Sequence, residues 1–252
     1  DAQESRGLGD VYKRQEIDYM RVSVTDKCNL NCFYCKSGPA KRLSHDDVLS
    51  IEDFSAVVKA FCEVGGRKIR ITGGEPLGRK GVLTLVEIVV ECGVKATMTT
   101  NGTLLKNYAH DLKNAGLNEI NVSLDTLDKD KYFKIGGGDL DSVIEGIELC
   151  SALGFKLKIN AVLLKGITDE IYPLAEFARN VGASLRFIEL MPFEATERYF
   201  SQRFISASEV ANRFDLVKTD RRGHVTYYKS KMGEIGFITP VSYTHLTLPT
   251  TS

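Results

Sequence analysis

The chain has 252 residues, of which 43% are apolar, and its 33 basic residues balance 33 acidic ones. This length and apolar content are sufficient for one sizeable core. The balanced charge gives no indication of a nucleic-acid or membrane partner, and no apolar run has the length of a bilayer span or the pattern of a signal peptide.

Short β-branched runs alternate along the chain with amphipathic helical patterns. The strand-like runs are Arg21–Thr25, Lys68–Thr72, Lys95–Thr99, Glu119–Leu124, Lys156–Leu163 and Leu185–Leu190. The helical patterns are Ile51–Val64, Leu83–Cys92, Leu104–Ala115, Leu140–Leu153 and Ile171–Val181. Such alternation predicts parallel strands with right-handed crossovers. Six units are too few for a complete eight-fold barrel, so the sequence predicts an α/β fold: a partial, open, six-stranded β/α TIM-like barrel with a short C-terminal α/β extension.

Capping residues support these boundaries. Ser50, followed three residues later by Asp53, predicts a helix start. A glycine follows each helical pattern as a stop signal, namely Gly65, Gly93, Gly116, Gly154 and Gly182.

Strand alternation predicts which side chains face the interior of the barrel. In Lys68–Thr72 the two isoleucines share one face, while the lysine, arginine and threonine share the other. The strands that begin at Arg21, Glu119 and Lys156 alternate in the same way. Because the outer face packs under helices, the polar and cationic set points into the bore. Unpaired buried charge is costly, so we expect a polar ligand there; an antiparallel sheet with one solvated face is the alternative.

Three cysteines, Cys28, Cys32 and Cys35, form a C-x3-C-x2-C motif after the first strand. Iron–sulfur clusters are normally held by four cysteines, and structural zinc sites also have four ligands. A three-cysteine loop without a nearby fourth ligand therefore predicts a 4Fe–4S cluster with one iron open to a substrate or cofactor. A zinc knuckle that uses His45 and a buried thiol cluster are the alternatives.

Polar and glycine residues collect in the turns after the strands. After the second strand, the paired Gly73 and Gly74 allow backbone amides to approach a ligand closely, and Glu75 is suited to receive a ligand ammonium. Later turns contain Asn101, Ser123, Asp125, Lys165 and Met191. The carboxyl ends of parallel strands meet at one rim, where such barrels have their active sites. We therefore expect the site at the rim that carries the cysteine motif.

The other three cysteines, Cys62, Cys92 and Cys150, lie singly in helical patterns. We interpret them as buried apolar side chains. The set does not have the spacing of a secreted disulfide framework, so the sequence predicts a protein of the reducing cytoplasm.

The motifs together resemble the radical S-adenosylmethionine (SAM) superfamily. The resemblance rests on the cysteine motif, which has an aromatic residue before its last cysteine, and on the Gly-Gly-Glu-Pro that follows the next strand. Seven ordered segments resemble more narrowly the GTP 3′,8-cyclase family, which acts first in molybdenum cofactor biosynthesis: RVSVTDKCNLNCFYC, KIRITGGEPLGRKG, TMTTNGTLL, INVSLDTLD, GIELCSALGF, LLKGITD and LRFIELMPF. The resemblance extends from about Ile17 to Ser242.

The resemblance implies a radical SAM lyase with GTP as substrate. Cys28, Cys32 and Cys35 would hold the cluster, whose open iron binds SAM. The cofactor-binding positions would be Tyr34, Gly73, Gly74, Glu75, Ser123 and Met191. The GTP-binding positions would be Arg21, Arg70, Thr99 and Lys165, with Lys68 and Arg186 as further candidates. A 5′-deoxyadenosyl radical would take the ribose 3′ hydrogen, and the resulting carbon radical would attack purine C8. The resemblance also implies an electron donor such as flavodoxin or ferredoxin and is compatible with a homodimer.

Both ends of the chain depart from the family pattern. The family has a second three-cysteine motif near its C-terminus that anchors the purine, whereas the residues from Tyr243 to Ser252 contain no cysteine. We therefore expect a non-native or disordered leader at 1–15, the partial barrel at 16–200, a truncated extension at 201–242 and a non-native tail at 243–252. SAM cleavage would survive in such a chain, whereas GTP cyclisation would be poor or absent.

Two other functions fit parts of the sequence. One is a radical SAM enzyme that modifies a peptide or another small molecule, which the cationic bore and the LLKGITD segment disfavour. The other is a non-catalytic iron–sulfur or metal module, which would bind metal without cleaving SAM.

Overall fold

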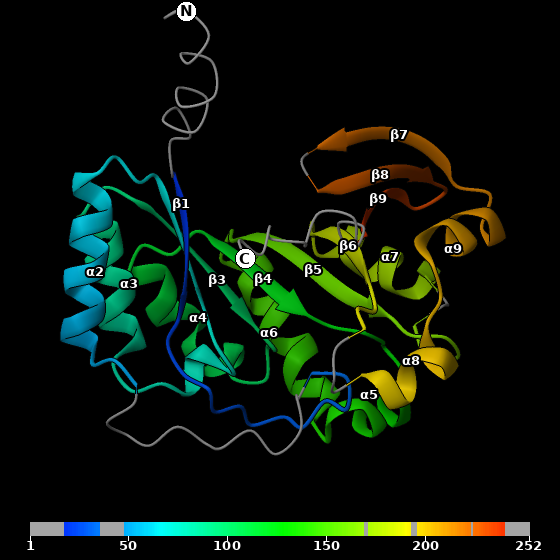
Figure 1. The fold of residues 1–252 in the computed structure, drawn as a ribbon, viewed down its shortest axis with the longest axis horizontal. Coiled ribbons are helices and arrows are strands. Elements are labelled where there is room, and N and C mark those ends of the chain that lie inside the picture. The colour runs from blue at the N-terminus through cyan, green and yellow to red at the C-terminus, as the bar shows by residue number, and fades with distance from the viewer. Residues whose placement is uncertain (1–17, 36–47, 169–170, 193–195, 223, 240–252) are drawn as a thin grey trace, which may run out of the picture.

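The computed structural model describes residues 18–35, 48–168, 171–192, 196–222 and 224–239. Within these residues, nine strands form one sheet in the order β1-β2-β3-β4-β5-β6-β9-β8-β7 (Figure 1). The strands are β1 (Tyr19–Ser23), β2 (Lys68–Thr72), β3 (Lys95–Thr100), β4 (Glu119–Ser123), β5 (Lys156–Leu163), β6 (Ser184–Glu189), β7 (Val217–Arg222), β8 (Val225–Ser230) and β9 (Gly233–Ile238). Strands β1 to β6 are parallel, each paired with the next in sequence, which confirms the predicted architecture.

Helices connect the parallel strands. The five that the sequence predicts are α2 (Ile51–Glu63), α3 (Val82–Glu91), α4 (Leu105–Asn114), α6 (Leu140–Ala152) and α7 (Ile171–Asn180). The sequence patterns did not predict the short 3-10 helix η2 (Pro76–Gly78), α5 (Lys129–Gly136), α8 (Glu197–Arg203) or α9 (Ala207–Arg213). In the described parts of the chain, no helix is both long enough and apolar enough to cross a bilayer.

The core lies between the helices and one face of the sheet. Ile69, Val122 and Phe187, on three different strands, are fully buried in the same cluster as Val58 of α2 and Leu85 of α3. The aliphatic side chains of the strands therefore face the helices, as strand alternation predicts, and the polar side chains face the opposite way, into the bore.

The C-terminal extension continues the sheet beyond the six predicted strands. Strand β9 pairs in parallel with β6, β8 pairs antiparallel with β9, and β7 pairs antiparallel with β8. In Figure 1 these three strands lie at the edge of the sheet away from β1. The open barrel is thus closed further on one side by residues that come last in the described chain.

The predicted helix boundaries are confirmed where capping residues mark them. Ser50 and Asp53 form a capping box at the start of α2, in which each side chain accepts a hydrogen bond from the other residue's backbone N–H. The five predicted stop glycines all have positive φ angles, between 66° and 88°. The predicted leader at 1–15, the predicted tail at 243–252 and His45 lie outside the described residues.

Candidate active site

The cysteine loop (residues 24–35) follows β1 at the carboxyl end of the parallel strands. In Figure 1 it runs in blue from the end of β1 toward α5. The N–H of Asn31 donates to the Gly136 carbonyl at 2.9 Å, and the N–H of Phe33 donates to the Ile135 carbonyl at 3.1 Å. The position of the loop therefore depends on a helix that the sequence did not predict.

Gly73 and Gly74 pack against the start of the cysteine loop. The N–H of Gly74 donates to the Thr25 carbonyl at 2.6 Å. A Cβ at Gly74 would lie 2.2 Å from the Lys27 carbonyl oxygen, and one at Gly73, where φ is 146°, would lie 2.5 Å from that of Thr25. These glycines thus allow the turn after β2 to pack closely against the cysteine loop. Contact between the glycines and a cofactor stays a prediction.

The Gly74→Ala substitution is expected to displace the cysteine loop, because the new methyl group would overlap the Lys27 carbonyl. Overpacking of this kind costs about 1–3 kcal/mol of stability. We expect a lower midpoint of urea unfolding and poorer iron retention after anaerobic reconstitution. Gly78→Ala is the matched control, since a Cβ at Gly78 meets nothing within 4 Å. Equal behaviour of the two variants would contradict the proposed packing role.

Glu75 braces the turns after β2 and β3. Its side chain is buried: one carboxylate oxygen accepts hydrogen bonds from the Leu77 N–H at 3.0 Å and the Thr100 hydroxyl at 2.7 Å, and the other from the Asn101 N–H at 2.7 Å. Burial raises the pKa of this carboxyl, and the three hydrogen bonds partly offset that effect. Protein donors thus use three of the roughly four acceptor positions of this carboxylate, and contact between Glu75 and a ligand ammonium stays a prediction.

Asn101 connects the β3 turn to the cysteine loop. Its Nδ2 donates to Asn29 Oδ1 at 2.8 Å and lies 3.6 Å from the Cys28 Sγ. Asn29 Nδ2 in turn donates to the Thr103 hydroxyl at 2.8 Å. A cavity of about 960 Å³ beside this connection is bordered by Cys28 and Glu75 but by none of the predicted GTP-binding residues.

Tyr34 and Asp125 join the cysteine loop to the end of β4. The Tyr34 hydroxyl donates to Asp125 Oδ2 at 2.5 Å, and the Val162 N–H donates to Oδ1 at 2.8 Å. Burial raises the pKa of Asp125 to about 6, although both hydrogen bonds favour its ionised form. Burial and the adjacent carboxylate also raise the pKa of Tyr34. The pair therefore fixes the aromatic residue of the cysteine motif against the barrel.

The polar face of the sheet forms the wall of the bore. Arg21 on β1 is opposite Arg70 on β2, and Asn160 on β5 is opposite both Ser123 on β4 and Arg186 on β6. These side chains come from five of the six parallel strands. Strand alternation therefore brings together the cations that the sequence assigned to the bore.

Several polar atoms of this wall are buried without a partner. Among the described residues, five buried side-chain polar atoms have no hydrogen-bond partner: Arg70 Nε, Asn121 Oδ1, Tyr132 Oη, Asn160 Oδ1 and Arg186 Nε. All but the tyrosine belong to the bore-facing set of the strands. An unpaired buried polar group is costly, so this wall has the chemistry of a surface that a polar ligand completes.

A carboxylate holds three lysines at the amino end of the bore. Glu119, the first residue of β4, is only 1% exposed and forms ion pairs with Lys158, with Lys95 at 2.7 Å and with Lys68 at 3.4 Å. Burial opposes its ionisation, but the lysines outweigh this effect and lower the pKa of Glu119 to about 2. Three cations against one anion leave this end of the bore positive.

The remaining predicted residues lie at or near the carboxyl ends of the strands. Ser123 ends β4, and Thr99 is the next-to-last residue of β3; both are half-buried. Met191, two residues beyond β6, is 38% exposed. Lys165, after β5, has an exposed side chain, and its backbone N–H donates to the Arg203 carbonyl at 2.8 Å. The four residues thus share one rim of the barrel, with Lys165 at its outer edge.

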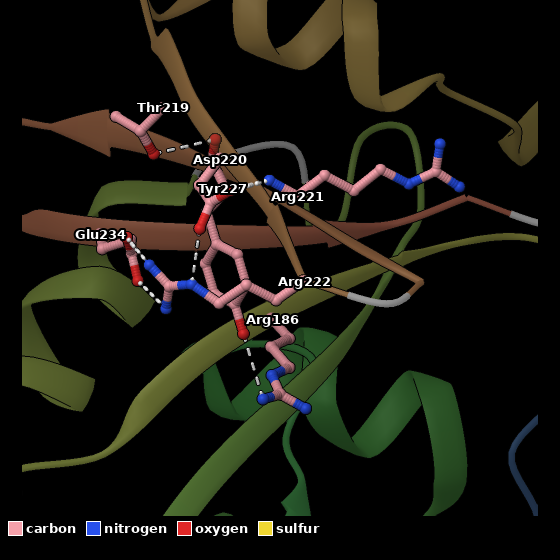
Figure 2. Close-up of polar contacts among 7 residues, drawn as sticks. All are labelled: Arg186, Thr219, Asp220, Arg221, Arg222, Tyr227 and Glu234. Carbon is pink, nitrogen blue, oxygen red and sulfur yellow. Dashed lines mark hydrogen bonds and ion pairs between the residues drawn. The ribbon is translucent and has the colours of Figure 1, made fainter.

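Tyr227 on β8 is a residue that the sequence analysis missed. Its hydroxyl accepts a hydrogen bond from Arg186 Nη2 at 3.1 Å (Figure 2). A local signal was available, because two β-prone runs flank Lys231, Met232 and Gly233 and indicate a hairpin. The pairing of that hairpin with β6 has no local signal.

Comparisons with known proteins agree with this fold. The Radical SAM superfamily model matches residues 22–178. The crystal structure of Streptococcus suis SuiB bound to S-adenosylmethionine superposes with a TM-score of 0.63 at 22% identity, over 70% of this chain and 41% of that one. Methylornithine synthase (PylB) superposes with a TM-score of 0.57 at 16% identity, over 77% of this chain and 60% of that one. Fold and cysteine loop together therefore define a radical SAM protein.

Proteins similar in sequence identify the family within this superfamily. A GTP 3′,8-cyclase of Alkaliphilus oremlandii (strain OhILAs) is 42% identical over 247 residues, which cover 93% of this chain and 77% of that protein. A GTP 3′,8-cyclase of Thermodesulfovibrio yellowstonii is 40% identical over 248 residues, covering 92% and 76%. The chain belongs to the GTP 3′,8-cyclase family of the radical SAM superfamily.

The cofactors of the radical SAM superfamily are a 4Fe–4S cluster and SAM, and the donor set at this rim fits them. Burial, followed by the negative charge of Asp125, Cys35 and Cys28, raises the pKa of the Cys32 thiol to about 12. Within the described residues, no three His, Cys, Asp or Glu side chains are gathered as they are around a bound ion. Cys28 and Cys35 are nevertheless close enough to Cys32 for their charge to act on its pKa.

Proposed function

We propose that this chain is a radical SAM lyase of the GTP 3′,8-cyclase type, the type of enzyme whose reaction converts GTP to a 3′,8-cyclised product in molybdopterin precursor synthesis. The names of its relatives support the reaction. The observation that carries the proposal for this chain is the bore wall, where cations and unpartnered buried polar atoms lie on the same face of the sheet. That wall belongs to the same barrel whose carboxyl rim carries the cysteine loop.

The chain's own residues would hold the cofactors at the rim. Cys28, Cys32 and Cys35 are the proposed ligands of the cluster. Tyr34, Gly73, Gly74, Glu75, Ser123 and Met191 are the proposed SAM-binding positions, with Glu75 as the proposed partner of a ligand ammonium. When bound, the two cofactors supply the one-electron chemistry that removes a hydrogen atom from the substrate.

The proposed substrate contacts come from the bore wall. Arg21 and Arg70 are in register on neighbouring strands, so their guanidinium groups can bind neighbouring phosphate oxygens, which suit the planar fork of arginine. Thr99, Lys165, Lys68 and Arg186 complete the proposed set. The positive amino end of the bore around Glu119 further favours a polyanion over a neutral substrate.

We further propose a reducing environment and an external reductant. All six cysteines carry free thiols, which suits the cytoplasm. A one-electron donor such as flavodoxin or ferredoxin would reduce the cluster, and a homodimer is compatible with this assignment.

Arg70→Met is expected to weaken GTP binding by about 10- to 100-fold, the loss expected when hydrogen bonds to a charged group disappear. Arg70 Nε is buried without a partner, and the guanidinium carbon lies 5.5 Å from the centre of the Tyr19 ring. The dissociation constant is measured by calorimetry on the anaerobically reconstituted protein. Arg213→Met on α9 is the matched control, because it removes an arginine outside the bore and should leave the affinity unchanged.

A second measurement tests the reaction class. The reconstituted protein is incubated with SAM and a reductant, and 5′-deoxyadenosine is quantified with and without GTP. Formation of 5′-deoxyadenosine together with GTP binding supports the proposal. Cleavage of SAM by a protein that does not bind GTP would point to another substrate, such as a peptide. Absence of 5′-deoxyadenosine from a cluster-loaded sample would remove the radical assignment itself.

A further inference from the structure

Three residues are aligned across the strands at the C-terminal edge of the sheet. Arg186 on β6 is in register with Gly236 on β9, which is in register with Tyr227 on β8. The Arg186 Nη2 donates a hydrogen bond to the Tyr227 hydroxyl at 3.1 Å, and Figure 2 shows the two side chains meeting end to end. The C-terminal extension therefore contacts a side chain of the bore wall.

Gly236 makes this contact sterically feasible. A Cβ at Gly236 would lie 3.2 Å from Tyr227 Cε1, 3.3 Å from Arg186 Cγ and 2.7 Å from Val225 Cγ1. A side chain on the middle strand would occupy the space through which the flanking side chains pass. The glycine in this strand thus marks a close approach between neighbouring side chains.

The Tyr227 ring is also held by Arg222 of the neighbouring strand β7. The Arg222 guanidinium carbon lies 4.4 Å from the ring centroid, in a cation–π contact. Arg222 is held in turn by Glu234 through two hydrogen bonds of 3.1 and 3.0 Å and by Asp220 through one of 3.0 Å (Figure 2). Tyr227 as a whole is only 5% exposed. Its hydroxyl therefore has a defined position.

Tyr227 orients Arg186 without neutralising it. Among the described residues, no carboxylate pairs with Arg186, and its Nε is buried without a partner. Burial lowers the pKa of Lys158, and repulsion from the nearby Arg186 guanidinium lowers it as well. Asn160, in register with Arg186 on β5, has an Oδ1 without a hydrogen-bond partner. A carboxylate would cancel the arginine's charge, whereas a neutral hydroxyl fixes its direction and preserves the charge for an anionic ligand.

We propose that Tyr227 is a positioning residue that aims the Arg186 guanidinium at an anionic group of the substrate, with a phosphate as the chemical class. The proposal rests on the proposed function, because GTP supplies the phosphates. It assigns the C-terminal hairpin of β8 and β9 to the substrate site, although neither strand carries a predicted substrate ligand.

Tyr227→Phe tests the proposal by removing one oxygen atom while keeping the ring under Arg222. We expect the dissociation constant for GTP, measured by calorimetry on the reconstituted protein, to rise about 5- to 10-fold, the effect of an ordinary intramolecular hydrogen bond, because the lost bond orients Arg186 and does not itself contact the ligand. Tyr228→Phe is the matched control, since the Tyr228 ring packs edge-on against Phe237 at 5.3 Å. It should leave GTP affinity unchanged. Thermal unfolding midpoints of both variants check the fold.

A double-mutant cycle separates positioning from a general structural effect. If Tyr227 acts through Arg186, Tyr227→Phe should add no further loss of GTP affinity in an Arg186→Met background. Equal losses in both backgrounds, or unchanged affinity in Tyr227→Phe alone, would overturn the positioning role while leaving the proposed function in place. A wild-type protein that binds no GTP would overturn both.

Discussion

Cys32→Ala is expected to abolish both iron retention and SAM cleavage. The thiol lies centrally in the cysteine loop, and a Cβ on Gly136 of α5 would come within 2.9 Å of its sulfur. Its surroundings are therefore fixed, and no other described cysteine can take its place, since Cys62, Cys92 and Cys150 lie on or at the ends of the core helices. The loss of activity should exceed the reduction of about 10- to 100-fold that follows substitution of a residue that only supports a metal ligand.

Iron content, visible absorbance and 5′-deoxyadenosine are measured after anaerobic reconstitution. Cys92→Ser, at the end of α3, is the matched control and should retain cluster and activity. Zinc in place of iron in the wild-type protein, or iron sufficient for two clusters per chain, would contradict a single 4Fe–4S site. Full activity in Cys32→Ala would remove the cysteine motif from the chemistry altogether.

Local sequence patterns predicted the parallel part of the fold closely. The runs Lys68–Thr72 and Lys156–Leu163 coincide with β2 and β5, and the other four predicted strands are displaced by only one or two residues at either end. These strands are predictable because burial of one face imposes a period of two on the sequence. The same period correctly separated Ile69, in the core, from Arg70, in the bore.

The parts that sequence analysis missed depend on contacts between distant segments. Strand β7 is exposed along its whole length, so its burial pattern does not mark it as a strand. The parallel pairing of β9 with β6 crosses about fifty residues of sequence and is decided by the completed sheet. Helix α5 ends in consecutive glycines, which argue against a helix, yet its last turn holds the cysteine loop.

The candidate site was predicted in its composition more than in its contacts. Gly73, Gly74 and Glu75 were correctly placed at the rim, but their closest partners are protein groups that no local pattern indicates. Tyr227 was missed because its importance comes from Arg186, which lies 41 residues earlier in the chain. Residue type and strand position thus identify candidate ligands, and only the assembled sheet identifies the residues that hold them.

Glu119→Leu is expected to destabilise the fold by about 3 kcal/mol, because removal of one partner of a buried ion pair leaves its counter-charge uncompensated. The Lys158 side chain is only 11% exposed and has little access to water, whereas those of Lys95 and Lys68 are 48% and 29% exposed and can turn outward. The uncompensated charge therefore falls mainly on Lys158. We expect a lower free energy of unfolding in urea at neutral pH.

Glu145→Leu is the matched control, because Glu145 pairs with Lys106 on the surface, where both side chains are more than half exposed and ion pairs contribute little.

The stabilities of the two variants should also respond differently to acid. The pKa of Glu119 is lowered from 4.5 to about 2 in the folded protein, so its contribution is complete above pH 4.5 and is lost as the pH falls toward 2. The stability advantage of the wild type over Glu119→Leu should shrink across that range, while its difference from Glu145→Leu stays small. Equal unfolding free energies of the two variants at neutral pH would show that the lysines do not need this carboxylate.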